Sequence, residues 1–199
     1  MKKPTAQGML LIRDPAQVRA LASPARQEII DALAAAGACS AAELAGHLGR
    51  PPDALYFHLK RLLAVGLIVE REPRRNGRHI ATVYDVPGRP VRIQYGGAVG
   101  GPALQQVVGS ALRLAGRDFG RAFAPGGGAI TDGPGRNLWG GRVKGWVGRR
   151  ELVEINRLIK RLSDVIGSGR PGRRRRPQTF TYVLAPVRPS RRAGQGASR

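Results

Sequence analysis

The side chains best suited to chemistry in this 199-residue chain are basic groups near residues 60 and 75. Lys60 and Arg61 lie in a stretch whose leucines recur at helical spacing. Four more arginines surround the polar turn that follows: Arg71, Arg74, Arg75 and Arg78. Guanidinium and ammonium groups donate hydrogen bonds to phosphate oxygens and to guanine edges. These residues therefore predict binding to a polyanion.

The sequence lacks the motifs of common catalytic and metal sites. It has no phosphate-binding loop, no dinucleotide-binding glycine pattern, no HExxH and no GxSxG. Cys39 is the single cysteine, and His47, His58 and His79 do not have the spacing of metal ligands. Glu43 and His47 could share a helix face, but two ligands do not make a site. We expect no enzyme activity, no cofactor and no metal.

The charge of the chain is large and uneven. There are 34 Lys and Arg against 13 Asp and Glu, a net charge of +21, yet residues 14–70 sum to −1. Residues 167–199 hold nine arginines and no acid. This balance favours nucleic acid as the partner, although a GC-rich coding bias or a solubilising basic tail would also produce it.

Membrane and secreted classes are excluded by the apolar pattern. No apolar stretch reaches the roughly 18 residues of a membrane-spanning helix. Residues 9–12 are too short for the apolar core of a signal peptide, and one cysteine cannot build a disulfide framework. We expect a cytoplasmic protein that does not bind membranes.

Two helices with clear start signals are predicted in the first half of the chain. Ser23-Pro24 places a capping residue before a proline, whose missing N–H costs nothing at the first helical position. Apolar residues then recur at helical spacing as far as Ala36. Ser40 and Glu43 have the spacing of a capping box, which starts a short helix that ends at Gly49.

A third helix is predicted over residues 52–65, followed by a hairpin. The inner face of the helix carries three leucines: Leu55, Leu59 and Leu62. After Gly66 the pattern changes, and residues 67–69 and 78–85 read as two strands that close at Asn76-Gly77. The order of helix, short helix, turn, helix and hairpin is typical of a winged helix-turn-helix.

Four short motifs fall in register across these elements. They are Leu21-Ala22-Ser23-Pro24-Ala25-Arg26, Glu43-Leu44-Ala45 with Leu48-Gly49, His58-Leu59-Lys60-Arg61-Leu62, and Val65-Gly66-Leu67-Ile68. Together they closely resemble the ArsR-type winged-helix transcriptional regulators over residues 14–86. The resemblance implies a DNA-binding regulator, usually a homodimer, whose recognition helix at residues 52–65 enters the major groove of duplex DNA.

The resemblance also implies two sets of DNA contacts. The recognition helix would contribute Asp53 near its tip and the outward residues Tyr56, Phe57, Lys60 and Arg61, while His58 packs inward. The hairpin would place its arginines, Arg71, Arg74, Arg75 and Arg78, along the backbone or minor groove. The alternative for the hairpin is a solvated turn that keeps an edge strand from aggregating.

The tip of the recognition helix departs from the family pattern. Relatives usually offer Ser, Thr or Gln to the bases, whereas this chain has Pro51, Pro52, Asp53 and Ala54. The Tyr56-Phe57 pair could touch thymine methyl groups, or the C-terminal half of the chain could cover it. A second hypothesis is therefore an interaction protein that uses a degenerate winged-helix fold to bind protein or RNA.

The C-terminal half is predicted to be a small α+β module. Helical spacing covers residues 104–123 and 150–166, and strand-like patterns cover residues 137–147 and 178–187. Trp139 and Trp146 could line a ligand pocket or fill the core. The helix at 150–166 could be a dimer seam or could pack on its own sheet.

The expected architecture is mainly α with small β. It consists of a winged helix-turn-helix DNA-binding domain at 1–86, an α+β dimerisation or sensing domain at 101–187, and a disordered basic tail at 188–199. Expected partners are double-stranded DNA and a second copy of the chain. A small-molecule effector remains open, without an identity.

Overall fold

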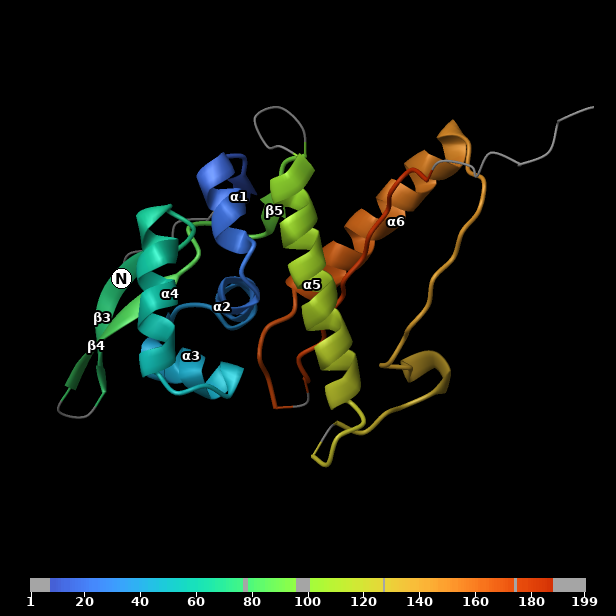
Figure 1. Cartoon of the computed structure of the whole chain (residues 1–199). Coiled ribbons are helices and arrows are strands. Elements are labelled where there is room, and N and C mark those ends of the chain that lie inside the picture. Colours follow the sequence, from blue (N-terminus) through green and yellow to red (C-terminus); the bar gives the residue numbers. More distant parts are fainter. Residues whose placement is uncertain (1–7, 77–78, 96–100, 127, 174, 188–199) are drawn as a thin grey trace, which may run out of the picture.

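The computed structural model describes residues 8–76, 79–95, 101–126, 128–173 and 175–187. Along this part of the chain the elements are β1 (Leu10–Ile12), α1 (Pro15–Leu21), α2 (Pro24–Ala36), β2 (Cys39–Ser40), α3 (Ala41–Leu48), α4 (Asp53–Ala64), β3 (Val69–Asn76), β4 (His79–Asp85), β5 (Val91–Ile93), α5 (Gly101–Arg121), the 3-10 turn η1 (Gly133–Gly135) and α6 (Arg149–Gly167). Figure 1 shows α1 to α4 and the β3–β4 hairpin on one side, with α5 and α6 on the other.

The predicted starts of α2 and α3 are confirmed. Ser23 takes the cap position of α2 without a side-chain hydrogen bond, and Pro24 occupies the first turn. The helix ends at Ala36, before Gly37 with φ 96°. The Glu43 amide donates to the Ser40 hydroxyl at 3.2 Å, and the Ser40 amide donates to the Glu43 carboxylate at 2.7 Å. This is the capping box expected from the sequence, and it satisfies two amide groups that the helix itself leaves unpaired.

The core beneath these helices is aliphatic. Its fully buried members come from every helix of the N-terminal half and from the chain around the hairpin: Ile12, Val18, Ile29, Leu33, Leu44, Leu55, Leu59, Leu62, Leu67, Ile68 and Val86. Each such side chain contributes roughly 1.5–3 kcal/mol by leaving water. Burial of this set holds α4 in a fixed orientation against α2 and α3.

Helix α5 is joined to the same core. Val107 belongs to the core cluster. The buried Gln27 of α2 donates to the carbonyls of Leu21 and Val107 at 2.6 and 2.9 Å, and the Ser110 hydroxyl donates to the Ala22 carbonyl at 2.6 Å. These polar contacts fix α5 across α1 and α2 because buried donors would otherwise lack partners.

The hairpin is part of a three-stranded antiparallel sheet in the order β2-β4-β3. Strand β3 begins at Val69 rather than Leu67, because the chain at 65–68 still completes the end of α4. There the Gly66 amide donates to the Leu63 carbonyl and the Leu67 amide donates to the Leu62 carbonyl, both at 3.0 Å, with Gly66 at φ 68°. The turn expected to close at Asn76-Gly77 is described only in part, because Asn76 ends β3 whereas Gly77 lies outside the described residues.

A second, parallel pairing was not expected. The sequence predicts no strand between the domains at 1–86 and 101–187, yet Val91–Ile93 pair with Leu10–Ile12 as β5 with β1. Gly88 allows the close approach that this pairing needs, because a Cβ there would lie 1.9 Å from the Gly8 carbonyl oxygen.

The C-terminal half differs most from the prediction. Helices α5 and α6 form, but the strands expected at 137–147 and 178–187 do not. The described residues of 101–187 contain two helices and one 3-10 turn, rather than the α+β arrangement expected. A strand needs a neighbour to take its backbone hydrogen bonds, and neither segment lies in a sheet of the described chain. Trp139 and Trp146 are 75% and 91% exposed, so they neither fill a core nor line a closed pocket.

Candidate nucleic-acid interface

Helix α4 has one buried face and one exposed face. Leu55, Leu59 and Leu62 are at most 1% exposed. The outward residues named from the sequence, Tyr56, Phe57, Lys60 and Arg61, are all exposed. Tyr56 and Phe57 keep 53% and 62% of their surface, so the C-terminal half does not cover them. The helix thus presents two aromatic rings and two cations to solvent.

The start of α4 has no side-chain cap. Pro52 stands at the cap position with helical backbone angles, and the Leu55 amide donates to its carbonyl at 2.9 Å. Asp53 is exposed in the first turn, where a carboxylate interacts favourably with the helix dipole. The positive end of the helix dipole is therefore complemented by one carboxylate, that of Asp53.

An aromatic–cation pair links consecutive turns of α4. The Arg61 guanidinium carbon lies 5.6 Å from the centre of the Phe57 ring, within the range of a cation–π contact. The Phe57 ring also meets His58 edge-on, with 5.6 Å between centroids. This contact pre-orients Arg61 on the exposed face of the helix.

His58 lies at the base of this face, half-buried as predicted. Burial lowers its pKa below the ordinary 6.5, and the positive charges of Arg26 and Arg50 lower it further. The neutral imidazole is therefore the form that the folded protein favours.

The turn between α3 and α4 is fixed to α2 by an ion pair. Gly49 ends α3 in the left-handed conformation, at φ 61° and ψ 39°. The Arg50 guanidinium then reaches the nearly buried Glu28 carboxylate at 2.5 Å, and Arg117 of α5 meets the other oxygen of Glu28 at 2.5 Å. The orientation of α4 is thereby coupled to α2 and α5.

The hairpin arginines differ in their exposure and in their carboxylate partners. Arg71 lies 3.6 Å from the buried Asp85 carboxylate, which Arg89 also contacts. Arg74 lies 2.9 Å from Glu43 and donates to the Ala38 carbonyl at 3.1 Å. Arg75 is exposed, and no ion pair joins it to another described residue. Arg78 lies outside the described residues.

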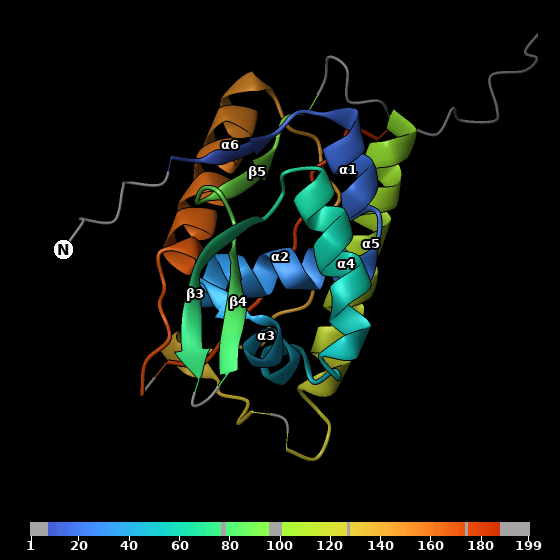
Figure 2. The same ribbon diagram turned by 90° about the vertical axis from the view of Figure 1, so that its left-hand side faces the viewer.

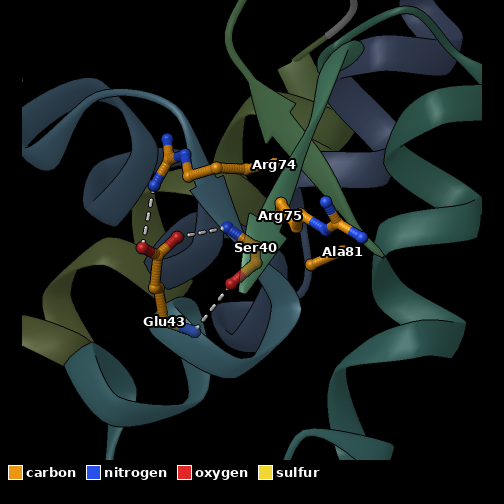
Figure 3. Close-up of a pocket in the computed structure, with 5 residues that line it drawn as sticks. All are labelled: Ser40, Glu43, Arg74, Arg75 and Ala81. Carbon is orange, nitrogen blue, oxygen red and sulfur yellow. Dashed lines mark hydrogen bonds and ion pairs between the residues drawn. The ribbon is translucent and has the colours of Figure 1, made fainter. Parts of the chain in front are cut away.

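Glu43 and Arg74 meet at a shallow pocket between the start of α3 and the hairpin, lined by Ser40, Glu43, Arg74, Arg75 and Ala81 (Figure 3). Its volume of about 170 Å³ is below that of typical small-molecule sites, which begin near 300 Å³. The polar groups of Ser40 and Glu43 are satisfied by each other and by Arg74. The pocket therefore connects α3 to the hairpin and offers little to a ligand.

Helix α4 and the β3–β4 hairpin both lie toward the viewer in Figure 2. Two further residues of this surface were not predicted from the sequence. Ile80 of β4 is 76% exposed opposite Arg75, which strict strand alternation could have indicated. Arg26 is close enough to Arg61 for each charge to act on the other, and its pKa is lowered by burial and by Arg61.

Other kinds of site find little support in the part of the chain that the structure describes. No cluster of three or more His, Cys, Asp or Glu side chains there could hold a metal ion. The Cys39 thiol is buried, donates weakly to the Gly37 carbonyl and has a raised pKa because of burial. Among the described residues no helix is both long and apolar enough to cross a membrane.

Residues 21–71 match the sequence model of a helix-turn-helix domain. The match runs from the end of α1 to the start of β3 and includes α2, α3, the turn at Gly49 and α4. It defines this part of the chain as a helix-turn-helix domain, and such a domain supports DNA binding and transcriptional regulation as the class of function. No curated protein matches the chain. The hypothesis of a degenerate fold that binds protein or RNA is not favoured by this match.

Proposed function

We propose that this protein is a sequence-specific transcriptional regulator of the ArsR type that binds duplex DNA through a winged helix-turn-helix and catalyses no reaction. One observation carries the proposal. A helix held by three buried leucines, within a helix-turn-helix domain, exposes Tyr56, Phe57, Lys60 and Arg61 beside an arginine-bearing hairpin.

In this proposal α4 lies in the major groove. Lys60 and Arg61 donate to phosphates or to guanine edges, and Asp53 accepts from a cytosine amino group. Tyr56 and Phe57 provide apolar contact to thymine methyl groups. These contacts replace the hydroxyl and amide side chains that the proline-rich tip lacks.

The β3–β4 hairpin acts as the wing. Arg75 is exposed and can meet a phosphate directly, whereas Arg71 and Arg74 must exchange carboxylate partners for phosphates. Both partners are anions, so the exchange preserves the type of interaction. Arg78 would extend the same row.

We further propose that the regulator is a homodimer. A two-fold dimer reads two half-sites about 34–36 Å apart, so the operator would be palindromic. Residues 101–187 would supply dimer contacts, and the arginines of 188–199 would add sequence-independent affinity for phosphates.

The test uses a duplex selected from a random library by the full chain. We expect Lys60→Ala and Arg61→Ala together to weaken binding to this duplex at least tenfold in fluorescence anisotropy. Lys160→Ala with Arg161→Ala, the same residue types on exposed positions of α6, is the matched control and changes the charge equally. If both double variants lose the same affinity, only net charge matters and recognition by α4 is refuted.

A further inference from the structure

Exposed apolar side chains are concentrated in the C-terminal half of the protein. Of the 24 large apolar side chains that are exposed in the described chain, 19 lie between residues 101 and 187. Scattered apolar residues are normal on a surface, whereas a concentration of this kind marks an interaction site.

Helix α6 carries the clearest of these surfaces. Its apolar residues follow helical spacing along one face: Leu152, Ile155, Leu158, Ile159, Leu162, Val165 and Ile166. Ile155 and Ile159 are half-buried and the other five are exposed. The opposite face holds the charged residues. A helix with three apolar positions per heptad normally packs on a core, yet no residue of α6 is buried.

Two strand-like segments flank this helix in the chain, one before it and one after it. Residues 178–187 alternate aromatic or aliphatic side chains with small ones, and residues 137–147 hold both tryptophans. Neither segment pairs with a strand in the described chain. Unpaired backbone groups in an apolar, strand-like segment are a template for pairing with another chain.

The area left exposed is large enough for a stable interface. The chain exposes 15,699 Å², whereas a compact monomer of 21.3 kDa exposes about 9,100 Å². The 28 residues outside the described ranges account for at most about 4,400 Å² of the difference, even as fully exposed chain. The remainder, about 2,200 Å², matches the roughly 1,000–2,500 Å² that each subunit of a permanent dimer buries.

We propose that a second copy of this chain covers the apolar face of α6 and pairs, strand to strand, with residues 178–187. A two-fold interface uses the same patch on both subunits. A single interface would therefore bury the apolar face of α6 and pair the backbone of residues 178–187 in both copies. The stretch between Arg176 and Arg188 carries no charge. Antiparallel pairing of the two copies therefore sets no like charges opposite each other, although each chain has a charge of +21.

This interface rests on the homodimer proposed above but not on DNA binding, so its test contains no DNA. Leu158→Glu with Val165→Glu changes two residues that are 50% and 56% exposed, so the subunit fold tolerates both. Val153→Glu is the matched control, since Val153 is 65% exposed on the opposite, charged face of α6. The readouts are mass by light scattering from 1 to 100 µM and hydrogen exchange of the amides in residues 178–187.

The wild type and the Val153 variant are expected at about 43 kDa, twice the 21.3 kDa of the chain, with slow exchange in 178–187. The double variant is expected at the monomer mass, with at least tenfold faster exchange there and unchanged helix content by circular dichroism. A wild type that stays monomeric at 100 µM overturns the proposal. So does a dimer that survives the double variant, or slow exchange of 178–187 in the monomer.

Discussion

The guanidinium of Arg74 donates to the carboxylate of Glu43 at 2.9 Å, and that carboxylate also accepts from the Ser40 amide at 2.7 Å. A single glutamate therefore caps α3 and neutralises an arginine of the hairpin. Hydrogen bonding to the Ser40 backbone, above all, lowers the pKa of Glu43. Glu43 is consequently charged at neutral pH and competes with phosphate for Arg74.

This competition predicts opposite effects of two substitutions on DNA affinity. Glu43→Gln should tighten binding by at most about fivefold, because an exposed ion pair contributes ~1 kcal/mol or less. Arg74→Ala should weaken binding and reduce the slope of log affinity against log salt by about 0.9, the value for one phosphate contact. Anisotropy titrations at several salt concentrations measure both. Weaker binding by Glu43→Gln would contradict the competition.

Two neighbouring residues of α4 should separate stability from binding. Leu59→Ala leaves a cavity in the core and is expected to lower the free energy of unfolding by about 2–5 kcal/mol, since Leu59 is 1% exposed. Phe57→Ala should change it by about 0.5 kcal/mol or less while weakening DNA binding. Urea denaturation and anisotropy give the two readouts. Equal losses of stability would show that the exposed face also supports the core.

Gly88→Ala tests the pairing of β1 with β5. Its new Cβ would lie 1.9 Å from the Gly8 oxygen and 2.9 Å from the Leu10 nitrogen, so we expect a loss of about 1–3 kcal/mol from overpacking. Gly46→Ala, in the exposed middle of α3 with nothing within 4 Å, should instead stabilise the protein by about 0.5–1 kcal/mol. Thermal unfolding compares them. A neutral Gly88→Ala would mean that the two strands do not approach this closely.

His58 should make stability sensitive to acid. Its pKa is lowered in the folded protein, so the unfolded chain binds the proton first as the pH falls below 6.5, and stability decreases from there. His58→Gln should flatten the fall of the melting temperature between pH 7 and pH 5, whereas His47→Gln, at an exposed position of α3, should retain most of it. An unchanged slope in His58→Gln would assign the acid sensitivity elsewhere.

Local sequence signals predicted the helix-turn-helix well because each is contained within a few residues. The capping box needs only Ser40 and Glu43, and the inner face of α4 needs only three leucines at helical spacing. The exposure of Tyr56, Phe57, Lys60 and Arg61 follows from the same spacing.

Most of the missed features depend on partners distant in the chain. Strands β1 and β5 have three residues each and meet across some 80 positions, and Arg74 pairs with a glutamate 31 residues away. At 137–147 and 178–187 the alternation favoured strands, but a strand also needs a neighbour for its backbone hydrogen bonds, which alternation alone does not provide. These segments remain unpaired in the described chain.

Sequence recognition by α4 is the property on which the proposed function depends. Its most direct test is the ratio of the affinities of the wild-type chain for its library-selected duplex and for the same duplex scrambled, measured by competition at 150 mM salt. We expect a ratio of about 10³ or more, as specific DNA-binding proteins show, and a marked fall in that ratio with Lys60→Ala and Arg61→Ala. A ratio near one would show that the positive charge binds DNA without sequence preference and that α4 does not recognise a base sequence.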